Sequence, residues 1–136
     1  MAKETGLGIT TLSVDDSGGT LRAIINDITN FDVSTPRAEQ DVTGVDKSAM
    51  ERLLLLADCS WTLNGVFNDA ATTGAHTVLS TIPSTSVART VTLVVSGQTL
   101  TTEILFSDYS LNRAANGALT WAAPGGLSDG TVPTWS

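Results

Sequence analysis

An alternation of apolar and polar residues from Ala57 to Asn68 constrains the fold more than any other part of the sequence. Apolar side chains occupy most odd positions: Ala57, Cys59, Trp61, Leu63 and Phe67. Polar side chains occupy most even positions: Asp58, Ser60, Thr62, Asn64 and Asn68. Successive side chains of a strand point to opposite faces of a sheet, so a period of two is typical of a half-buried strand. We therefore predict a strand over residues 56–67.

Other short segments alternate in the same way or are rich in Val, Ile and Thr, and turn residues separate them. They predict strands at 9–14, 20–24, 31–34, 88–95, 99–112 and 119–122. Turns are indicated at Gly18-Gly19, Ser96-Gly97 and Asn116-Gly117, since these pairs suit tight hairpin loops. One helix is expected within 72–82, ended by Pro83. The predicted fold class is mainly β: a β-sandwich or partial barrel of about seven strands with one flanking α-helix.

Three segments do not fit this regular pattern. Residues 36–50 are polar and charged, which indicates a long exposed loop or a hairpin end reaching beyond the core. Residues 48–55 combine a capping-box pattern with a run of leucines, so a short helix and an extension of the next strand remain open. Residues 124–136 contain two prolines and three glycines, and we expect an irregular C-terminal tail.

Size and charge limit the functions that the chain can have. Its 136 residues suit a single domain over 1–136. Seven basic and 14 acidic residues give a net charge of -7. Such a surface repels phosphate, which argues against binding nucleic acid by neutralising its backbone. It is compatible with DNA that passes by without adhering.

The sequence offers little for catalysis, and we expect that the protein is not an enzyme. His76 is the only histidine and lies in no recognised catalytic motif. Cys59 is the only cysteine, and the alternation places it on the apolar face with Trp61. One His and one Cys do not make a zinc site, and Asp15-Asp16 lacks the spacing of a calcium loop. No metal or cofactor is predicted.

The sequence gives no sign of export or membrane insertion. The N-terminal residues lead into no apolar stretch of signal-peptide length, and the densest apolar run, 53–57, is too short to span a bilayer. A single cysteine allows no internal disulfide. We therefore expect a protein that is made in the cytoplasm and does not contact a membrane.

Six segments are informative as an ordered set: 41–46, 59–69, 91–101, 103–111, 117–121 and 127–135, the last of which contains Asp-Gly-x-Val-Pro-x-Trp. This ordered set resembles the major tail tube protein of long, non-contractile-tailed phages (siphophages). The resemblance covers the chain from about residue 28. It implies a β-sandwich with one helix, six of which form a ring. Rings stack into a tube, and inner strands of neighbouring subunits join into one barrel around the lumen.

The resemblance also implies partners and a location. The subunit would bind copies of itself in stacked homo-hexameric rings of a virion tail, and tape measure and tail terminator proteins would complete the tail. DNA would pass through the lumen during genome ejection without specific binding. Six copies would carry about -42 per ring, which suits repulsion of DNA. An alternative of another class is a capsid-decorating or host-binding β-sandwich module of a virion.

In this family a long loop between two early strands reaches the neighbouring ring, and here it would map to Pro36–Met50. The candidate stacking residues are the charged ones of this loop: Arg37, Glu39, Asp41, Asp46 and Lys47. The candidates for acids facing the lumen are Glu39, Asp41, Asp46 and Asp58. Trp135, close to the C-terminus, is expected either to pack on its own domain or to anchor a neighbour.

Overall fold

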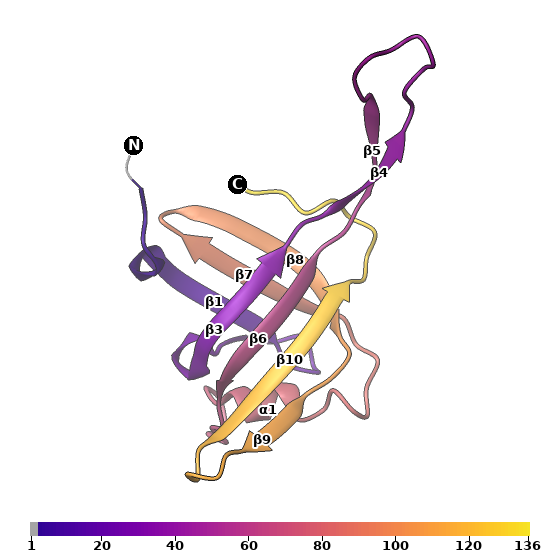
Figure 1. The fold of residues 1–136 in the computed structure, drawn as a ribbon. Coiled ribbons are helices and arrows are strands. Elements are labelled where there is room, and N and C mark those ends of the chain that lie inside the picture. The colour runs from indigo at the N-terminus through magenta and orange to yellow at the C-terminus, as the bar shows by residue number, and fades with distance from the viewer. Residues whose placement is uncertain (1–2) are drawn as a thin grey trace.

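The computed structural model describes residues 3–136 and consists mainly of β-strands (Figure 1). The ten strands are β1 (Ile9–Asp15), β2 (Leu21–Ala23), β3 (Ile28–Ser34), β4 (Arg37–Asp41), β5 (Arg52–Ala57), β6 (Ser60–Val66), β7 (Arg89–Val95), β8 (Gln98–Phe106), β9 (Ser110–Arg113) and β10 (Leu119–Leu127). One short helix, α1 (Ala75–Leu79), and two 3-10 turns, Gly6–Gly8 and Ile25–Asp27, complete the described part. The predicted fold class, mainly β with one helix, is confirmed.

Eight strands form one antiparallel sheet: seven follow the order β2-β1-β7-β8-β10-β6-β3, and β9 pairs with β10 off this path. The long β10 pairs with β9 over its first half and with β8 over its last three residues. The sheet curls into two facing layers, with β1, β7 and β8 in one layer and β3, β6 and β10 in the other (Figure 1). β4 and β5 form a separate two-stranded sheet that continues from β3 and β6.

The two layers enclose a hydrophobic core. In one layer the register aligns Phe31, Leu63 and Ala123 across β3, β6 and β10. In the other layer Leu93 lies opposite both Leu12 and Leu100. Burying each large side chain of this kind contributes about 1.5–3 kcal/mol. The alternation at 57–68 therefore predicts the buried face of β6 correctly.

The central indole of the core belongs to Trp61 on β6. It is 1% exposed, and its Nε1–H donates to Thr102 Oγ1 on β8 at 3.1 Å. This bond joins the two layers and satisfies a buried donor. Cys59 is fully buried on the same face, as the alternation predicts.

Helix α1 closes one end of the sandwich with Val78 and Leu79 buried against the core. Gly74 at the helix start provides no side-chain cap, and the buried Asp27 accepts from the Ala75 backbone N–H at 2.9 Å instead. The predicted helix over 72–82 is too long at both ends. Residues 71–73 and 80–84 form turns, held by bonds such as Ile82 N–H to Leu79 O at 3.1 Å.

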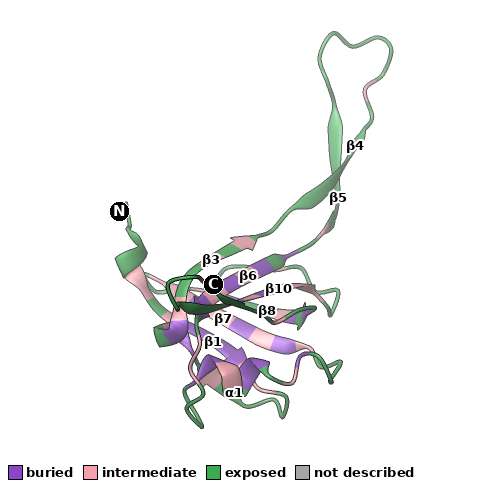
Figure 2. Cartoon of the chain, turned by 60° about the horizontal axis from the view of Figure 1, so that its bottom comes forward, coloured by how far each residue is buried: buried purple, intermediate pink, exposed green. Residues whose placement is uncertain are grey.

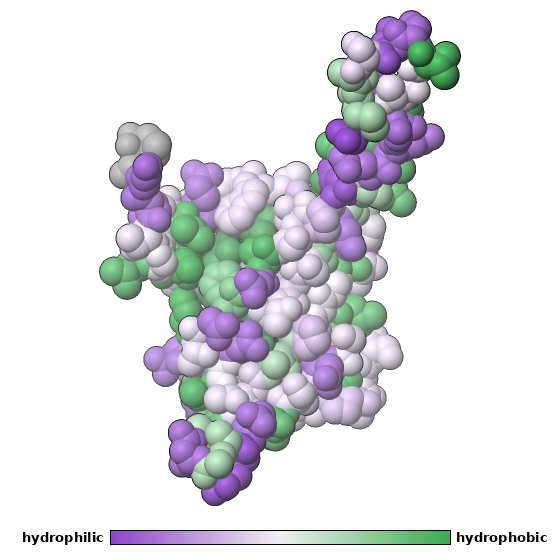
Figure 3. Space-filling view, viewed as in Figure 1, coloured by the Kyte–Doolittle hydropathy of each residue, from purple (hydrophilic) through white to green (hydrophobic). Residues whose placement is uncertain are grey.

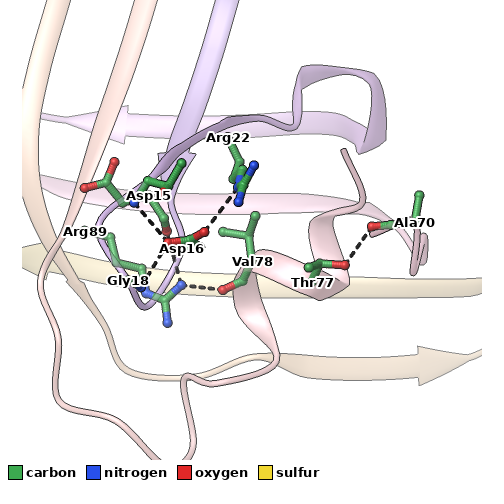
Figure 4. A network of polar contacts seen from close by, with 9 residues as sticks. Asp15, Asp16, Gly18, Arg22, Ala70, Thr77, Val78 and Arg89 are labelled. Carbon is green, nitrogen blue, oxygen red and sulfur yellow. Dashed lines mark hydrogen bonds and ion pairs between the residues drawn. The ribbon is translucent and has the colours of Figure 1, made fainter. Parts of the chain in front are cut away.

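A buried arginine ties the helix to the sheet (Figure 4). Arg89 is 1% exposed and donates to the backbone carbonyls of Asp15, at 3.2 Å, and of Val78, and to Thr81 Oγ1 at 2.7 Å. Burial lowers the pKa of this guanidinium from its ordinary value. These bonds hold the end of β1 against α1, since carbonyl oxygens replace the water that the charge loses.

Several predicted boundaries are wrong. The strand expected over 99–112 is divided at Ser107–Tyr109, because its two parts pair with different halves of β10. The strand expected over 56–67 breaks after Ala57, where Asp58 Oδ1 accepts from Cys59 N–H at 2.8 Å. These breaks and the extra hairpin bring the count to ten strands.

The irregular tail expected from Pro124 starts later, since β10 extends to Leu127. Gly125 in this stretch allows close packing. A Cβ at Gly125 would lie only 2.6 Å from Ile104 Cγ2, so glycine lets β10 and β8 approach each other. A Pro- and Gly-rich sequence that is typical of a loop is here an ordered strand.

Candidate assembly surfaces

The β4–β5 hairpin stands clear of the sandwich (Figures 1 and 2). It occupies the segment expected to be a long loop or a hairpin end, and residues 42–51 form its tip. Residues 48–51 are neither helix nor strand, and 52–55 belong to β5, so the helix alternative for 48–55 is wrong. An isolated two-stranded hairpin has little stability in water.

Four consecutive leucines of β5 lie in solvent. Leu53 and Leu54 are each 54% exposed, and Leu56 is 86% exposed. Leu55, Val42 and Met50 are also exposed. Exposed apolar side chains that lie next to one another indicate a surface for another molecule. The leucine run is the strongest such feature of the hairpin.

The register divides the hairpin into two unlike faces. Glu39 lies opposite Leu54 and Asp41 lies opposite Arg52, so these four side chains share one face, which we call the charged face. Gln40 lies opposite Leu53 on the other face, which we call the Leu53 face. Val42 and Glu51, the next pair outward, are joined by a backbone bond of 3.0 Å and belong to this second face.

Hydrogen bonds order the start of the hairpin tip. Asp41 Oδ1 accepts from Thr43 N–H at 2.9 Å and from Thr43 Oγ1 at 2.6 Å. Glu51 N–H in turn donates to Thr43 Oγ1 at 2.8 Å. The bonds from Thr43 hold the pKa of Asp41 below its ordinary value. Asp41 therefore has a local structural role in the tip.

The other candidate stacking residues also lie on the hairpin but at separate points along it. The Arg37 guanidinium, near the base, donates to Leu55 O at 3.1 and 2.8 Å. Asp46 and Lys47 form an exposed ion pair of 3.5 Å at the tip. Glu39 lies on the charged face with Asp41.

The four candidates for acids facing the lumen are spread over the same length. Asp58 lies at the base, where its N–H donates to Pro36 O at 2.9 Å. Glu39 and Asp41 share the charged face, and Asp46 lies at the tip. The structure brings Glu39 and Asp41 to one face and leaves the other two apart.

A second surface lies where the curled sheet does not close. The outer edge of β3 pairs with no strand in the described chain, and β1 pairs on its outer side only from Ser13 to Asp15. Between these edges runs a groove of about 490 Å³, which we call the seam groove. Its lining is Gly6, Ile9, Leu12, Ile25, Ile28, Thr29, Asn30 and Phe31. Figure 3 shows hydrophobic side chains gathered on this side of the molecule.

The residue pattern at 36–50 indicates an exposed hairpin end, but it does not indicate that the β5 leucines are exposed or that the seam groove exists. The leucines were visible as the densest apolar run, but such a run fits a buried strand or helix as well as an exposed one. The groove joins β1 to β3, which are not paired, so no local pattern could reveal it.

The residues considered for catalysis serve as packing groups. His76 Nδ1 lies 3.1 Å from Tyr109 Oη, and its ring packs beside Phe67. Burial raises the pKa of the Cys59 thiol. Within residues 3–136, His, Cys, Asp and Glu form no group of three that could hold a metal ion. No helix in that range is long and apolar enough to cross a membrane.

Trp135 lies against its own sandwich. It forms an isolated bridge with Leu100, and Thr99 and Ser136 exchange backbone bonds of 2.8 and 2.9 Å beside it. The tail thus covers part of the β8 edge that β10 leaves free. Trp135 is 51% exposed.

Comparison with solved structures identifies the architecture. A chain of the virion of a native gene transfer agent (GTA) particle superposes with a TM-score of 0.75 and 14% identity, covering 98% of this chain and 99% of that chain. A chain from the tail of an empty GTA particle, computed with helical refinement and C6 symmetry, gives a TM-score of 0.71 and 16% identity, covering 98% of each chain. This chain has the fold of a GTA tail chain. The sequence matches no protein-family model and no curated protein.

Proposed function

We propose that this protein is a structural subunit of a phage-type tail tube. Six copies form a ring, and stacked rings form a conduit for DNA during ejection. The observation that carries the proposal is the likeness in fold, over 98% of both chains, to a chain from a particle tail with C6 symmetry. The proposed role is structural and assigns no catalytic group.

Unpaired strand edges support assembly into a ring. The outer edge of β3 and most of the outer edge of β1 pair with no strand within the described chain. Such edges are a hazard in a free monomer, and closure into a ring removes them. In the layer of β3, β6 and β10, with β9 beside β10, pairing the outer edge of β3 with the outer edge of β9 in a neighbouring copy would give the continuous barrel expected around a lumen.

The hairpin supports stacking of rings. It projects beyond the sandwich and exposes both leucines and charges (Figure 2). The proposed stacking residues are Arg37, Glu39, Asp41, Asp46 and Lys47, and Trp135 is the proposed anchor for a neighbour. Glu39 and Asp41 share one face, so this face is the better candidate for an acidic lining that DNA would pass without adhering. Tape measure and tail terminator proteins are the further proposed partners in the virion.

Electron microscopy of the purified, concentrated protein tests the proposal. We expect rings or hollow tubes, with sixfold symmetry in end-on class averages. A protein that stays monomeric at all salt and protein concentrations would contradict it. Binding of that monomer to purified capsids would instead support a decorating module.

A further inference from the structure

We propose that the Leu53 face of one copy binds in the seam groove of a second copy. This inference rests on the proposed function and names the partner of the hairpin: the groove between β1 and β3 of the next subunit. Two apolar surfaces that lack partners in one chain would then cover each other.

The chemistry of the two surfaces matches. The seam groove is lined by aliphatic side chains, Phe31, two small polar residues and a glycine, and carries no charge. On the hairpin, the Leu53 face presents Leu53, Gln40 and Val42, with one charge, Glu51, at its outer end. The charged face would bring Glu39, Asp41 and Arg52 into the apolar groove. Burying charges without partners is costly, so the Leu53 face is favoured.

The hairpin does not reach the groove of its own chain. It begins after Ser34, where β3 ends, whereas the groove is lined by residues 28–31 in the first half of β3. The bond from Asp58 N–H to Pro36 O fixes the hairpin base in an extended direction. Figure 2 shows β4 and β5 leading away from the sandwich. The hairpin of a second copy is therefore the segment of matching chemistry that can bind in the groove.

This contact has a geometric consequence. Each copy offers one hairpin and one groove, so the contact is heterologous and leaves a free hairpin and a free groove at the two ends. Such contacts repeat without limit along an axis unless rotation closes them. Growth by repeated addition is the behaviour that a stacked tube requires.

Mixed single-cysteine variants test the contact. Leu53→Cys places a thiol on the Leu53 face, and Ile28→Cys places one in the groove. Leu54→Cys is the matched control, because Leu54 has the same 54% exposure, one residue away on the opposite face. The native Cys59 is fully buried and should therefore form no disulfide with either introduced cysteine. Disulfides form only where Cα atoms approach within about 7 Å.

Under mild oxidation of assembled protein, we expect disulfide-linked dimers from the mixture of Leu53→Cys with Ile28→Cys. We expect at least about tenfold less from Leu54→Cys with Ile28→Cys, since a strand turns successive side chains to opposite faces. Each variant is first compared with the parent by circular dichroism and thermal unfolding. If Ile28→Cys unfolds the protein, Thr29→Cys offers a second position in the groove.

The outcomes separate the two proposals. Tubes that form normally but give no hairpin-to-groove cross-link, or cross-link better through Leu54→Cys, would overturn this inference and leave the tail tube function standing. Failure of the unmodified protein to assemble under any condition would count against the tail tube function itself. Cross-linking of Leu53→Cys with itself alone would show hairpin-to-hairpin contact and would also overturn the inference.

Discussion

The sandwich and the β4–β5 hairpin are built from the same residue types but use them in opposite ways. In β6, Trp61 and Leu63 lie buried between two layers. In β5, Leu53 and Leu54 lie more than half exposed with no second layer over them. The apolar side chains of the sandwich are thus covered by other parts of the same chain. The hairpin has its own backbone ladder, the Arg37 bonds near its base and the bonds around its tip.

This difference separates stability from assembly. Substitutions in the sandwich should change the free energy of unfolding, because core side chains make most of their contacts within the chain. Substitutions in the hairpin should change association and leave unfolding nearly unaffected. The following predictions test that separation, from the largest expected change in stability to the smallest.

Trp61→Ala should be the most destabilising change. It removes one of the two buried tryptophan side chains and leaves Thr102 Oγ1 without its indole partner. Core truncations of this size cost about 3–5 kcal/mol, a large share of the stability of a small domain. Urea unfolding followed by fluorescence and circular dichroism would measure it. A loss below about 1 kcal/mol would contradict the placement of Trp61 in the core.

Gly65→Ala should destabilise by a smaller amount through overpacking. A Cβ at Gly65 would collide with the Asp27 backbone carbonyl and lie 2.7 Å from Trp121 Cζ2. Such insertions cost about 1–3 kcal/mol. Gly126→Ala is a matched control on the neighbouring strand, since its nearest atom lies 4.0 Å away. Equal melting temperatures for the two variants would be inconsistent with the register of β6 and β10.

Replacing residues 38–56 with Asn-Gly should leave stability within about 1 kcal/mol of the parent, because almost every side chain removed is exposed. The new two-residue turn would join Arg37 to Ala57, which already face each other. Assembly into tubes should be lost completely. Thermal unfolding would measure the stability of the variant, and electron microscopy of the same sample would show whether tubes form. A variant that still forms tubes would show that the hairpin is not required for assembly.

Acid should loosen the hairpin tip. The pKa of Asp41 is lowered by its bonds from Thr43, so the ionised form supports the folded tip. That support is present above the ordinary aspartate value of 3.8 and is lost as the pH falls through the lowered pKa. Amide exchange at Thr43 should rise in that window.

Asp41→Asn should show the same increase at neutral pH. Asp46→Asn is the matched control, because Asp46 makes its side-chain contact only with Lys47. If the two variants exchange alike at Thr43, Asp41 does not order the tip.

The sequence predicts the sandwich better than it predicts the surfaces. Alternation around Trp61 identifies a half-buried strand because one face of β6 packs inside the same chain. The β5 leucines do not follow this rule, since nothing in the described chain covers them. The alternation cannot say what lies beyond an apolar face, so 48–55 stayed open between helix and strand.

Tertiary geometry explains the remaining misses. The division between β8 and β9 depends on which half of β10 each one meets, and those pairings link distant segments. The seam groove exists because β1 and β3 approach without pairing. The polar composition of 36–50 indicates the exposed hairpin end, and the resemblance to tail tube proteins suggests its charged residues as contacts; neither singles out the leucines.

Hydrogen–deuterium exchange of the monomer and of the assembled protein tests the central claim most directly. The amides of β6 and β7 should be protected in both states, since their ladders lie within the sandwich. The amides of β4 and β5 should exchange rapidly in the monomer and become strongly protected on assembly. Hairpin amides that exchange at the same rate in both states would contradict the claim that another copy of the chain completes this hairpin.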